Sequence, residues 1–118
     1  MNKFQICLFF SLLSLVHMNM ICYDCNPASQ GSCTDPVRDN ATEVYCPRLA
    51  DMLSYCFSVY VDANTATNSG IYRGCMIKYE NDDNECDYLT LALSATGNVT
   101  WCETCVEDEC NVDQYQNA

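Results

Sequence analysis

Cysteine is the residue in this 118-residue chain with the clearest capacity for chemistry, and there are 11 of them. Two pairs have the C-x-x-C spacing, Cys22/Cys25 and Cys102/Cys105. In a reducing compartment this spacing is typical of zinc ligands or of a redox dithiol. In an oxidising compartment the same thiols form structural disulfides, and such a high cysteine content in a short chain favours a secreted disulfide scaffold. We therefore favour disulfides over a metal or redox site.

Other catalytic chemistry finds little support in the sequence. The chain has one histidine, His17, and it lies in the apolar N-terminal segment. Ser-His and Cys-His nucleophile pairs and His-ligated zinc are thereby excluded from the rest of the chain. The acidic run from Asp82 to Glu85, with Asp87, lacks the glycine and the ligand spacing of an EF-hand, which favours a solvated loop. We expect no enzyme activity, metal or cofactor.

The charge balance narrows the classes of partner. Sixteen acidic residues stand against five basic residues, which gives a formal net charge of −11. A nucleic-acid partner requires a basic surface, and anionic lipids attract Lys and Arg. We therefore expect neither nucleic-acid binding nor electrostatic membrane binding.

The N-terminus has the pattern of a secretory signal peptide. Lys3 supplies a short positive region, and the run from Phe4 to Val16 is mostly apolar but shorter than the roughly 20 residues of a membrane-spanning helix. We assign residues 1–20 to the signal, with cleavage between Ser14 and Ile21, and residues 21–118 to one domain. A short polar tail follows Cys110, without the apolar segment of a GPI signal. The expected product is secreted, extracellular and unanchored.

Alternating apolar residues predict a long β-hairpin in the middle of the chain. Between Tyr55 and Val61, residues Phe57, Val59 and Val61 share one face, with Ser58 and Tyr60 on the other. A second apolar run covers residues 71–78, and the small, polar segment from Asp62 to Gly70 predicts a long connecting loop.

Shorter patterns predict the remaining elements. Residues 42–46 fit a strand, and residues 48–53 fit one helical turn. Residues 88–93 resemble a strand, residues 95–98 a turn and residues 99–101 a returning strand. The sum is a small all-β, disulfide-rich domain in which bridges stand in for a large core.

The order of the cysteines and their neighbours resembles the LU-domain family (lymphocyte-antigen-six/urokinase-receptor), which has the three-finger fold. The opening Cys22-Tyr-Asp-Cys25 and the ending Cys105-Val-Glu-Asp-Glu-Cys110-Asn111 carry the likeness. Cys33-Thr-Asp-Pro36 and Arg73-Gly-Cys75 look like the arthropod quiver/sleepless and boudin members. One departure is that Glu103 and Thr104 separate two cysteines that are usually adjacent in the family.

The spacing alone leaves the pairing of the ten later cysteines open. The resemblance implies three fingers, between Cys22 and Cys46, Cys56 and Cys75, and Cys86 and Cys102. It also implies five bridges: Cys22–Cys56, Cys25–Cys33, Cys46–Cys75, Cys86–Cys102 and Cys105–Cys110.

Two N-glycosylation sequons begin at Asn40 and Asn98. We expect both to be used in a secreted chain. A glycan on Asn98 would cover the tip of finger III, and Asn40 lies in finger I, so that finger II is left as the sugar-free finger.

The resemblance implies a binding module that modulates a membrane receptor or ion-channel ectodomain. The alternative is a structural or adhesive component of epithelial junction assembly, as the boudin likeness implies. We predict that the long finger II loop forms the principal contact, because it is the longest inter-strand tip, carries no sequon and has its ends fixed by Cys56 and Cys75. The Tyr and Arg residues that flank it are the expected energetic anchors, since both types are enriched among interface hot spots. The candidate contacts are Tyr60, Asp62, Asn64, Asn68, Tyr72 and Arg73, with the acidic segment 82–87 as second choice.

Overall fold

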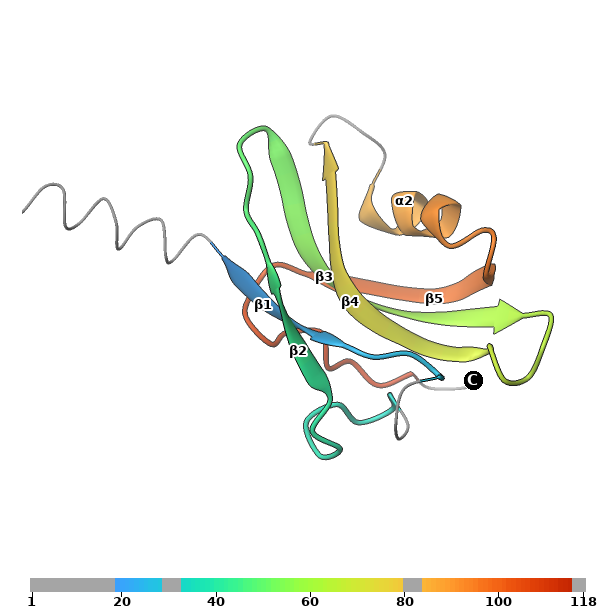
Figure 1. Cartoon of the computed structure of the whole chain (residues 1–118). Helices are drawn as coiled ribbons and strands as arrows, with labels where there is room; N and C mark the ends of the chain where they lie inside the picture. Colours follow the sequence, from blue (N-terminus) through green and yellow to red (C-terminus); the bar gives the residue numbers. More distant parts are fainter. Residues whose placement is uncertain (1–18, 29–32, 80–83, 116–118) are drawn as a thin grey trace, which may run out of the picture.

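The computed structural model describes residues 19–28, 33–79 and 84–115, which form two antiparallel sheets and a helix (Figure 1). β1 (Met20–Asp24) pairs with β2 (Thr42–Cys46). β3 (Met52–Ala63) lies between β4 (Gly70–Tyr79) and β5 (Gly97–Cys105) in the larger sheet, and α2 (Glu85–Ala92) precedes β5. The predicted signal peptide lies outside the described residues except for positions 19 and 20, and so do Asp82 and Asp83.

The central hairpin is the one that the alternating pattern predicts. β3 and β4 pair from Met52↔Tyr79 to Val61↔Gly70, and residues 64–69 connect them. Phe57, Val59 and Val61 lie on one face, as predicted, where they form a buried cluster with Tyr55 and with Leu89 of α2. Because side chains alternate between the faces of a strand, the intervening residues of β3 face the opposite side.

The predicted strand at residues 88–93 is wrong, because this segment lies in α2 and the turn after it. Asn84 is the N-cap of the helix, and its side-chain oxygen accepts a hydrogen bond from the Asp87 N–H at 2.9 Å. Leu89 and Leu93, one helical turn apart, pack against the β3 cluster, whereas Leu91 is 67% exposed. Finger III is therefore a helix, a turn and a strand, of which only the returning strand, within β5, is confirmed.

The predicted helical turn at residues 48–53 is also wrong. The strand predicted at residues 42–46 is confirmed as β2, and the chain must then reverse to enter β3 at Met52. A tight turn makes this reversal: the Met52 N–H donates to the Leu49 carbonyl at 3.3 Å, and Asp51 has a φ of 63°. A left-handed residue at this position is incompatible with a continuing α-helix.

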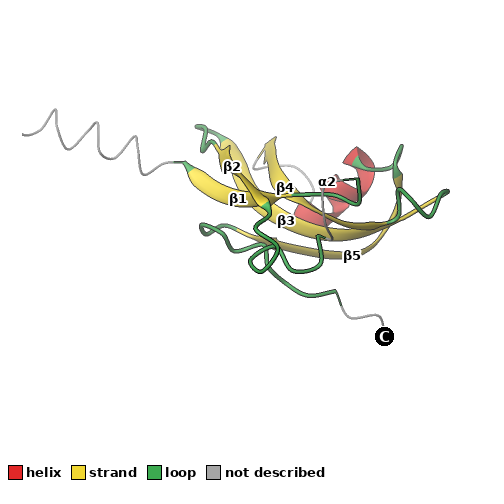
Figure 2. Cartoon of the chain, turned by 60° about the horizontal axis from the view of Figure 1, so that its bottom comes forward, coloured by secondary structure: helices red, strands yellow, loops and turns green. Residues whose placement is uncertain are grey.

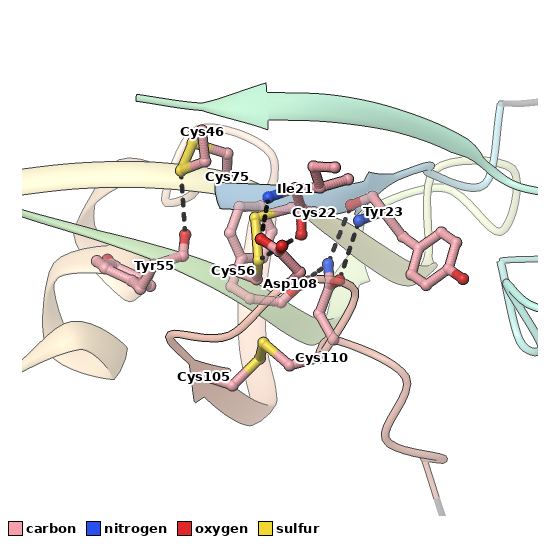
Figure 3. The surroundings of a disulfide bond; sticks show 12 residues. Ile21, Cys22, Tyr23, Cys46, Tyr55, Cys56, Cys75, Cys105, Asp108 and Cys110 are labelled. Carbon is pink, nitrogen blue, oxygen red and sulfur yellow. Dashed lines mark hydrogen bonds between the residues drawn. A yellow bond between two sulfur atoms is a disulfide. The ribbon is translucent and has the colours of Figure 1, made fainter. Parts of the chain in front are cut away.

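Disulfides hold the bases of the fingers together. The Cys22–Cys56 and Cys105–Cys110 bridges lie close to one another between β1, β3 and the segment after β5, with Cys46–Cys75 nearby (Figure 3). Met20 and three of these cysteines form a fully buried cluster. All ten cysteines pair as the family resemblance implies: Cys22–Cys56, Cys25–Cys33, Cys46–Cys75, Cys86–Cys102 and Cys105–Cys110.

The larger sheet is covered on both faces. α2 lies against one face, and the segment that follows β5 crosses the other (Figure 2). On that second side, a small cluster joins Cys25, Cys33 and Ile71 to partly buried Tyr60 and Tyr115. This arrangement brings the C-terminal segment to the end of finger II.

Candidate functional site

A groove of about 690 Å³ lies at the base of the finger II loop. Three segments that are far apart in the sequence line it: the start of finger I, the finger II tip and the C-terminal segment. None of its described lining residues carries a formal charge, although the chain as a whole is strongly acidic. The lining residues are Pro27, Ala28, Cys33, Thr34, Tyr60, Ala66, Thr67, Asn68, Ser69, Gly70, Ile71 and Tyr115.

Aromatic rings form one wall of this finger II groove. The Tyr60 and Tyr115 rings are stacked, with centroids 4.4 Å apart and planes inclined by 19°. Trp101 of β5, the cross-strand partner of Tyr60, also contacts Tyr115, at a centroid distance of 5.6 Å and an angle of 59°. Such pairs restrain each other beyond the effect of their burial, so that this wall is already formed without a ligand.

The loop of finger II is ordered by its own short polar side chains. The Ser69 hydroxyl accepts a hydrogen bond from the Ala63 N–H at 2.9 Å and lies 3.0 Å from the Thr65 carbonyl. The Asn68 N–H donates to the same Thr65 carbonyl at 3.2 Å. From β4, the Tyr72 hydroxyl donates to the Asn68 carbonyl at 2.7 Å. These contacts explain how a loop of small polar residues holds one shape.

A glycine allows finger I to approach finger II at the groove. Gly70 has a φ of 148°, which residues with side chains rarely adopt. A Cβ atom at this position would lie only 2.9 Å from Cγ of Pro27. Gly70 therefore fixes both the backbone path out of the loop and the close contact with Pro27.

Arg73 is the hub that holds two walls of the groove in place. Its guanidinium donates to the Cys33 carbonyl at 2.9 Å and the Thr34 carbonyl at 3.2 Å in finger I. It also donates to the Asn111 and Asp113 carbonyls of the C-terminal segment, both at 2.9 Å. The Ser58 hydroxyl, 2.7 Å from Nη1, completes the set.

Burial has the largest effect on the pKa of the Arg73 guanidinium. Arg73 is only 1% exposed, and desolvation lowers the pKa of its guanidinium, partly offset by the carboxylates of Asp113 and Asp35. Arginine stays protonated despite such a shift, so that the site keeps a buried cation surrounded mainly by carbonyl oxygens. The planar fork with five N–H donors suits this set of acceptors, which a lysine could not satisfy.

Asn111, directly after the last cysteine, positions the start of the C-terminal segment. Its side-chain oxygen accepts from the Tyr23 N–H at 3.0 Å, and its amide nitrogen donates to the Tyr23 carbonyl at 2.9 Å and the Phe57 carbonyl at 3.0 Å. Asn111 therefore mimics a strand partner for β1 and ties the segment to β3. The Asp108 side chain accepts from the Ile21 N–H at 3.0 Å in the same region (Figure 3).

The structure places only some of the predicted contact residues of finger II in the groove. Tyr60 and Asn68 line the groove, and Asp62 and Asn64 are exposed near it. Tyr72 pairs with Val59 and packs against the cluster on the opposite face, with only its hydroxyl reaching the loop. Arg73 is the clear correction: it is buried and cannot contact a partner directly.

Sequence reasoning missed Tyr115, Trp101 and Pro27 as parts of this site. No local pattern marks them, because all three come from segments distant in the sequence. Trp101 reaches Tyr60 through the pairing of β3 with β5, whereas the Arg73 hydrogen bonds hold finger I and the C-terminal segment beside finger II. Glu85 and Asp87 are the described acidic residues of the second-choice site, and both belong to the first turn of α2. Negative side chains at this position stabilise the helix through its dipole.

The C-x-x-C motifs do not form internal disulfides. Cys22 and Cys25 bond to Cys56 and Cys33, and Cys102 and Cys105 bond to Cys86 and Cys110. The sulfur atoms of Cys56, Cys105 and Cys110 lie within 4.8 Å of one another, but all three are already disulfide-bonded. A thiolate ligand or nucleophile would require one of these bridges to be reduced.

Three disulfide-anchored fingers and a closing Cys-Asn define a three-finger domain of the LU class. The chain belongs to the Quiver family: the model of the Quiver family u-PAR/Ly-6-like domain matches residues 20–111. This match confirms the family resemblance seen in the sequence. No curated protein and no solved structure matches the chain. Within the described part of the chain, no helix has both the length and the hydropathy for crossing a bilayer.

Proposed function

We propose that the protein is a secreted, soluble module that modulates a membrane receptor or ion channel by binding its ectodomain through the finger II groove. A u-PAR/Ly-6-like domain of the Quiver family fits a small secreted or membrane-associated receptor-modulating module. Domains of this kind are typically binding modules without enzyme activity. The apolar leader, which has the pattern of a signal peptide, supports secretion.

The observation that carries this proposal is the preformed, uncharged groove. Its aromatic wall offers apolar area at low entropic cost, and the loop adds hydroxyl, amide and backbone groups that can form hydrogen bonds. The fold holds these groups on a disulfide-bonded base through Arg73. A partner therefore pays little ordering entropy in the site when it inserts an exposed side chain or a loop.

Affinity capture on living cells tests this proposal. The purified protein carries a photo-cross-linker on its N-terminus, and cross-linked surface proteins are identified by mass spectrometry. We compare the wild type with Tyr60→Ala and with a variant whose residues 64–69 are a Gly/Ser stretch of equal length. Tyr45→Ala is the matched control, because Tyr45 is 76% exposed on β2 and does not line the groove.

The expected result is one dominant receptor or channel that the wild type and Tyr45→Ala capture equally and that both finger II variants lose. Equal capture by all four proteins would contradict the groove as the contact. Recovery of an epithelial junction component in place of a receptor or channel would favour the alternative, structural function.

A further inference from the structure

The sequon at Asn98 lies two residues after the turn at residues 93–96, which forms the tip of finger III. Asn98 lies near the start of β5 and pairs with Asp62 at the end of β3. Finger III approaches this point through α2 and the turn at residues 93–96. The sequon therefore lies beside the loop of finger II.

Asn98 faces the same side of the sheet as the finger II groove. Its neighbour Val99 pairs with Val61 and packs into the buried cluster on the α2 side, so the exposed Asn98 side chain points to the opposite side. Tyr60 also faces that side, where it stacks on Tyr115. Asp62 and Tyr60 are two residues apart on β3. At about 3.4 Å per residue and about 4.8 Å between strands, the Asn98 backbone lies roughly 8–10 Å from that of Tyr60.

We propose that Asn98 carries an N-linked glycan that screens the finger II groove and limits which partners can reach it. The effect of this glycan on a receptor or channel partner rests on the proposed function. The screening of the groove by the glycan does not. In the secretory pathway, the Asn98 side-chain nitrogen displaces the diphosphate of a lipid-linked oligosaccharide at the anomeric carbon of the first sugar. The N–C bond forms, the sugar–phosphate bond breaks, and the amide loses one proton.

The size of the glycan determines which partners can reach the groove. An N-linked oligosaccharide is bulky and strongly solvated. Attached one strand away from Tyr60, it occupies the approach to the aromatic wall without blocking the groove itself. A narrow element of a partner, such as one loop, still enters, whereas a broad surface is excluded. Glycan size then regulates the same site that the proposed function uses.

The second sequon supplies a matched control. Asn40 is also exposed, but it lies in the turn before β2, where the Ala41 N–H donates to the Pro36 carbonyl at 2.9 Å. In Figure 1 this turn is at the bottom of the view, whereas the start of β5 is on the right, beside finger II. A glycan on Asn40 is therefore expected to leave the groove accessible.

A nanobody is the probe that tests screening without knowledge of any partner. It is selected against the Asn98→Gln protein and kept only if Tyr60→Ala abolishes its binding. Glycopeptide mass spectrometry first measures occupancy of Asn98 in protein secreted from insect cells. Binding is then compared for the wild type, Asn98→Gln, Thr100→Ala, Thr100→Ser and Asn40→Gln. Thr100→Ala removes the sequon while keeping Asn98, and Thr100→Ser preserves it.

We expect an occupied Asn98 and at least tenfold tighter nanobody binding to Asn98→Gln and Thr100→Ala than to the wild type, Thr100→Ser or Asn40→Gln. Enzymatic trimming of the Asn98 glycan to its first sugar, on the folded wild-type protein, should give the same gain in affinity. Because this treatment changes no residue, it separates the effect of the glycan from any folding defect of the variants. An unmodified Asn98, equal affinities, or an equal gain from Asn40→Gln would overturn the proposal. Because no receptor takes part, these outcomes do not depend on the capture experiment.

Discussion

The rings of Tyr60 and Tyr115 stack with their centroids 4.4 Å apart, although one belongs to finger II and the other follows the last disulfide. This contact makes the C-terminal segment a part of the finger II site. It depends on Arg73, whose guanidinium binds the carbonyls of Asn111 and Asp113 just before Tyr115. The groove therefore depends on the contact between finger II and the C-terminal segment, and not on the finger II loop alone.

Replacement of Arg73 should destabilise the fold strongly. In Arg73→Met, four carbonyls and the Ser58 hydroxyl lose a buried donor, and we expect a loss of about 3–5 kcal/mol in the free energy of unfolding. Arg73→Lys should recover only part of this loss, because an ammonium cannot reproduce the fork.

Guanidinium unfolding with the disulfides intact measures these values. The control is Arg38→Ala, which changes an exposed arginine and should stay within about 0.5 kcal/mol of the wild type. A loss below about 1 kcal/mol in Arg73→Met would show that Arg73 does not hold the groove walls together.

The nearly isosteric change Asn111→Asp should be almost as damaging. The new carboxylate oxygen would face the Tyr23 and Phe57 carbonyls in place of an amide donor, in a site that is 1% exposed. We expect a loss of about 2–4 kcal/mol and a lower yield of secreted protein. Asn64→Asp makes the same change at an exposed loop position and should be secreted at the wild-type level. Normal secretion and stability of Asn111→Asp would exclude the proposed role of the amide.

Stability should fall at alkaline pH partly because of Tyr55. This side chain is fully buried, its hydroxyl donates to the Glu85 carbonyl at 3.3 Å, and burial raises its pKa well above the ordinary value of 10.0. The folded state therefore keeps the phenol proton while the unfolded chain loses it. The resulting stabilisation is complete below about pH 10 and is lost as the pH rises further.

Chemical denaturation between about pH 9 and pH 11 checks this sign. Tyr55→Phe should show a shallower decline than the wild type, whereas Tyr45→Phe, at an exposed position, should follow the wild type. Parallel declines of the wild type and Tyr55→Phe would show that Tyr55 does not contribute to the pH dependence.

The mature chain should begin at or before Met20. This residue is fully buried in the disulfide cluster and pairs with Cys46 at the start of β1, so its removal would open the core. Within the predicted cleavage window, this places the new N-terminus between Leu15 and Met20. N-terminal sequencing of protein secreted from insect cells measures it directly. A chain that starts at Cys22 and retains the wild-type fold would contradict the structural role of Met20.

The sequence predicted those parts of the molecule that local pattern or cysteine order determines. Alternation in residues 55–61 favours a strand, because a helix would place Val59 on the side opposite to Phe57 and Val61. The family's cysteine order supplied the bridges, which spacing alone could not. In residues 88–93, by contrast, leucines at every second position suited a strand, but the structure has a helix here, which Asn84 caps.

The candidate site was only partly predictable for a different reason. Tyr60 and Asn68 belong to the hairpin and could be found from its loop. Tyr115 and Pro27 belong to segments that the long-range hydrogen bonds of Arg73 and Asn111 hold beside finger II, and Trp101 reaches Tyr115 through the pairing of β3 with β5. Neither kind of long-range contact leaves a local signature. Arg73 flanks the loop, and the enrichment of arginine among interface hot spots favoured a surface contact there, whereas the structure buries it.

The measurement that tests the central claim most directly is the affinity of the captured ectodomain for matched single variants. Surface plasmon resonance would compare the wild type with Tyr60→Ala, Tyr115→Ala and the exposed control Tyr45→Ala, after circular dichroism and thiol titration show that each variant is folded and fully oxidised. If the finger II groove is the contact, both groove variants lose at least tenfold in affinity, about 1.4 kcal/mol or more, while Tyr45→Ala binds as the wild type. Unchanged affinity in both groove variants would place the contact elsewhere on the molecule.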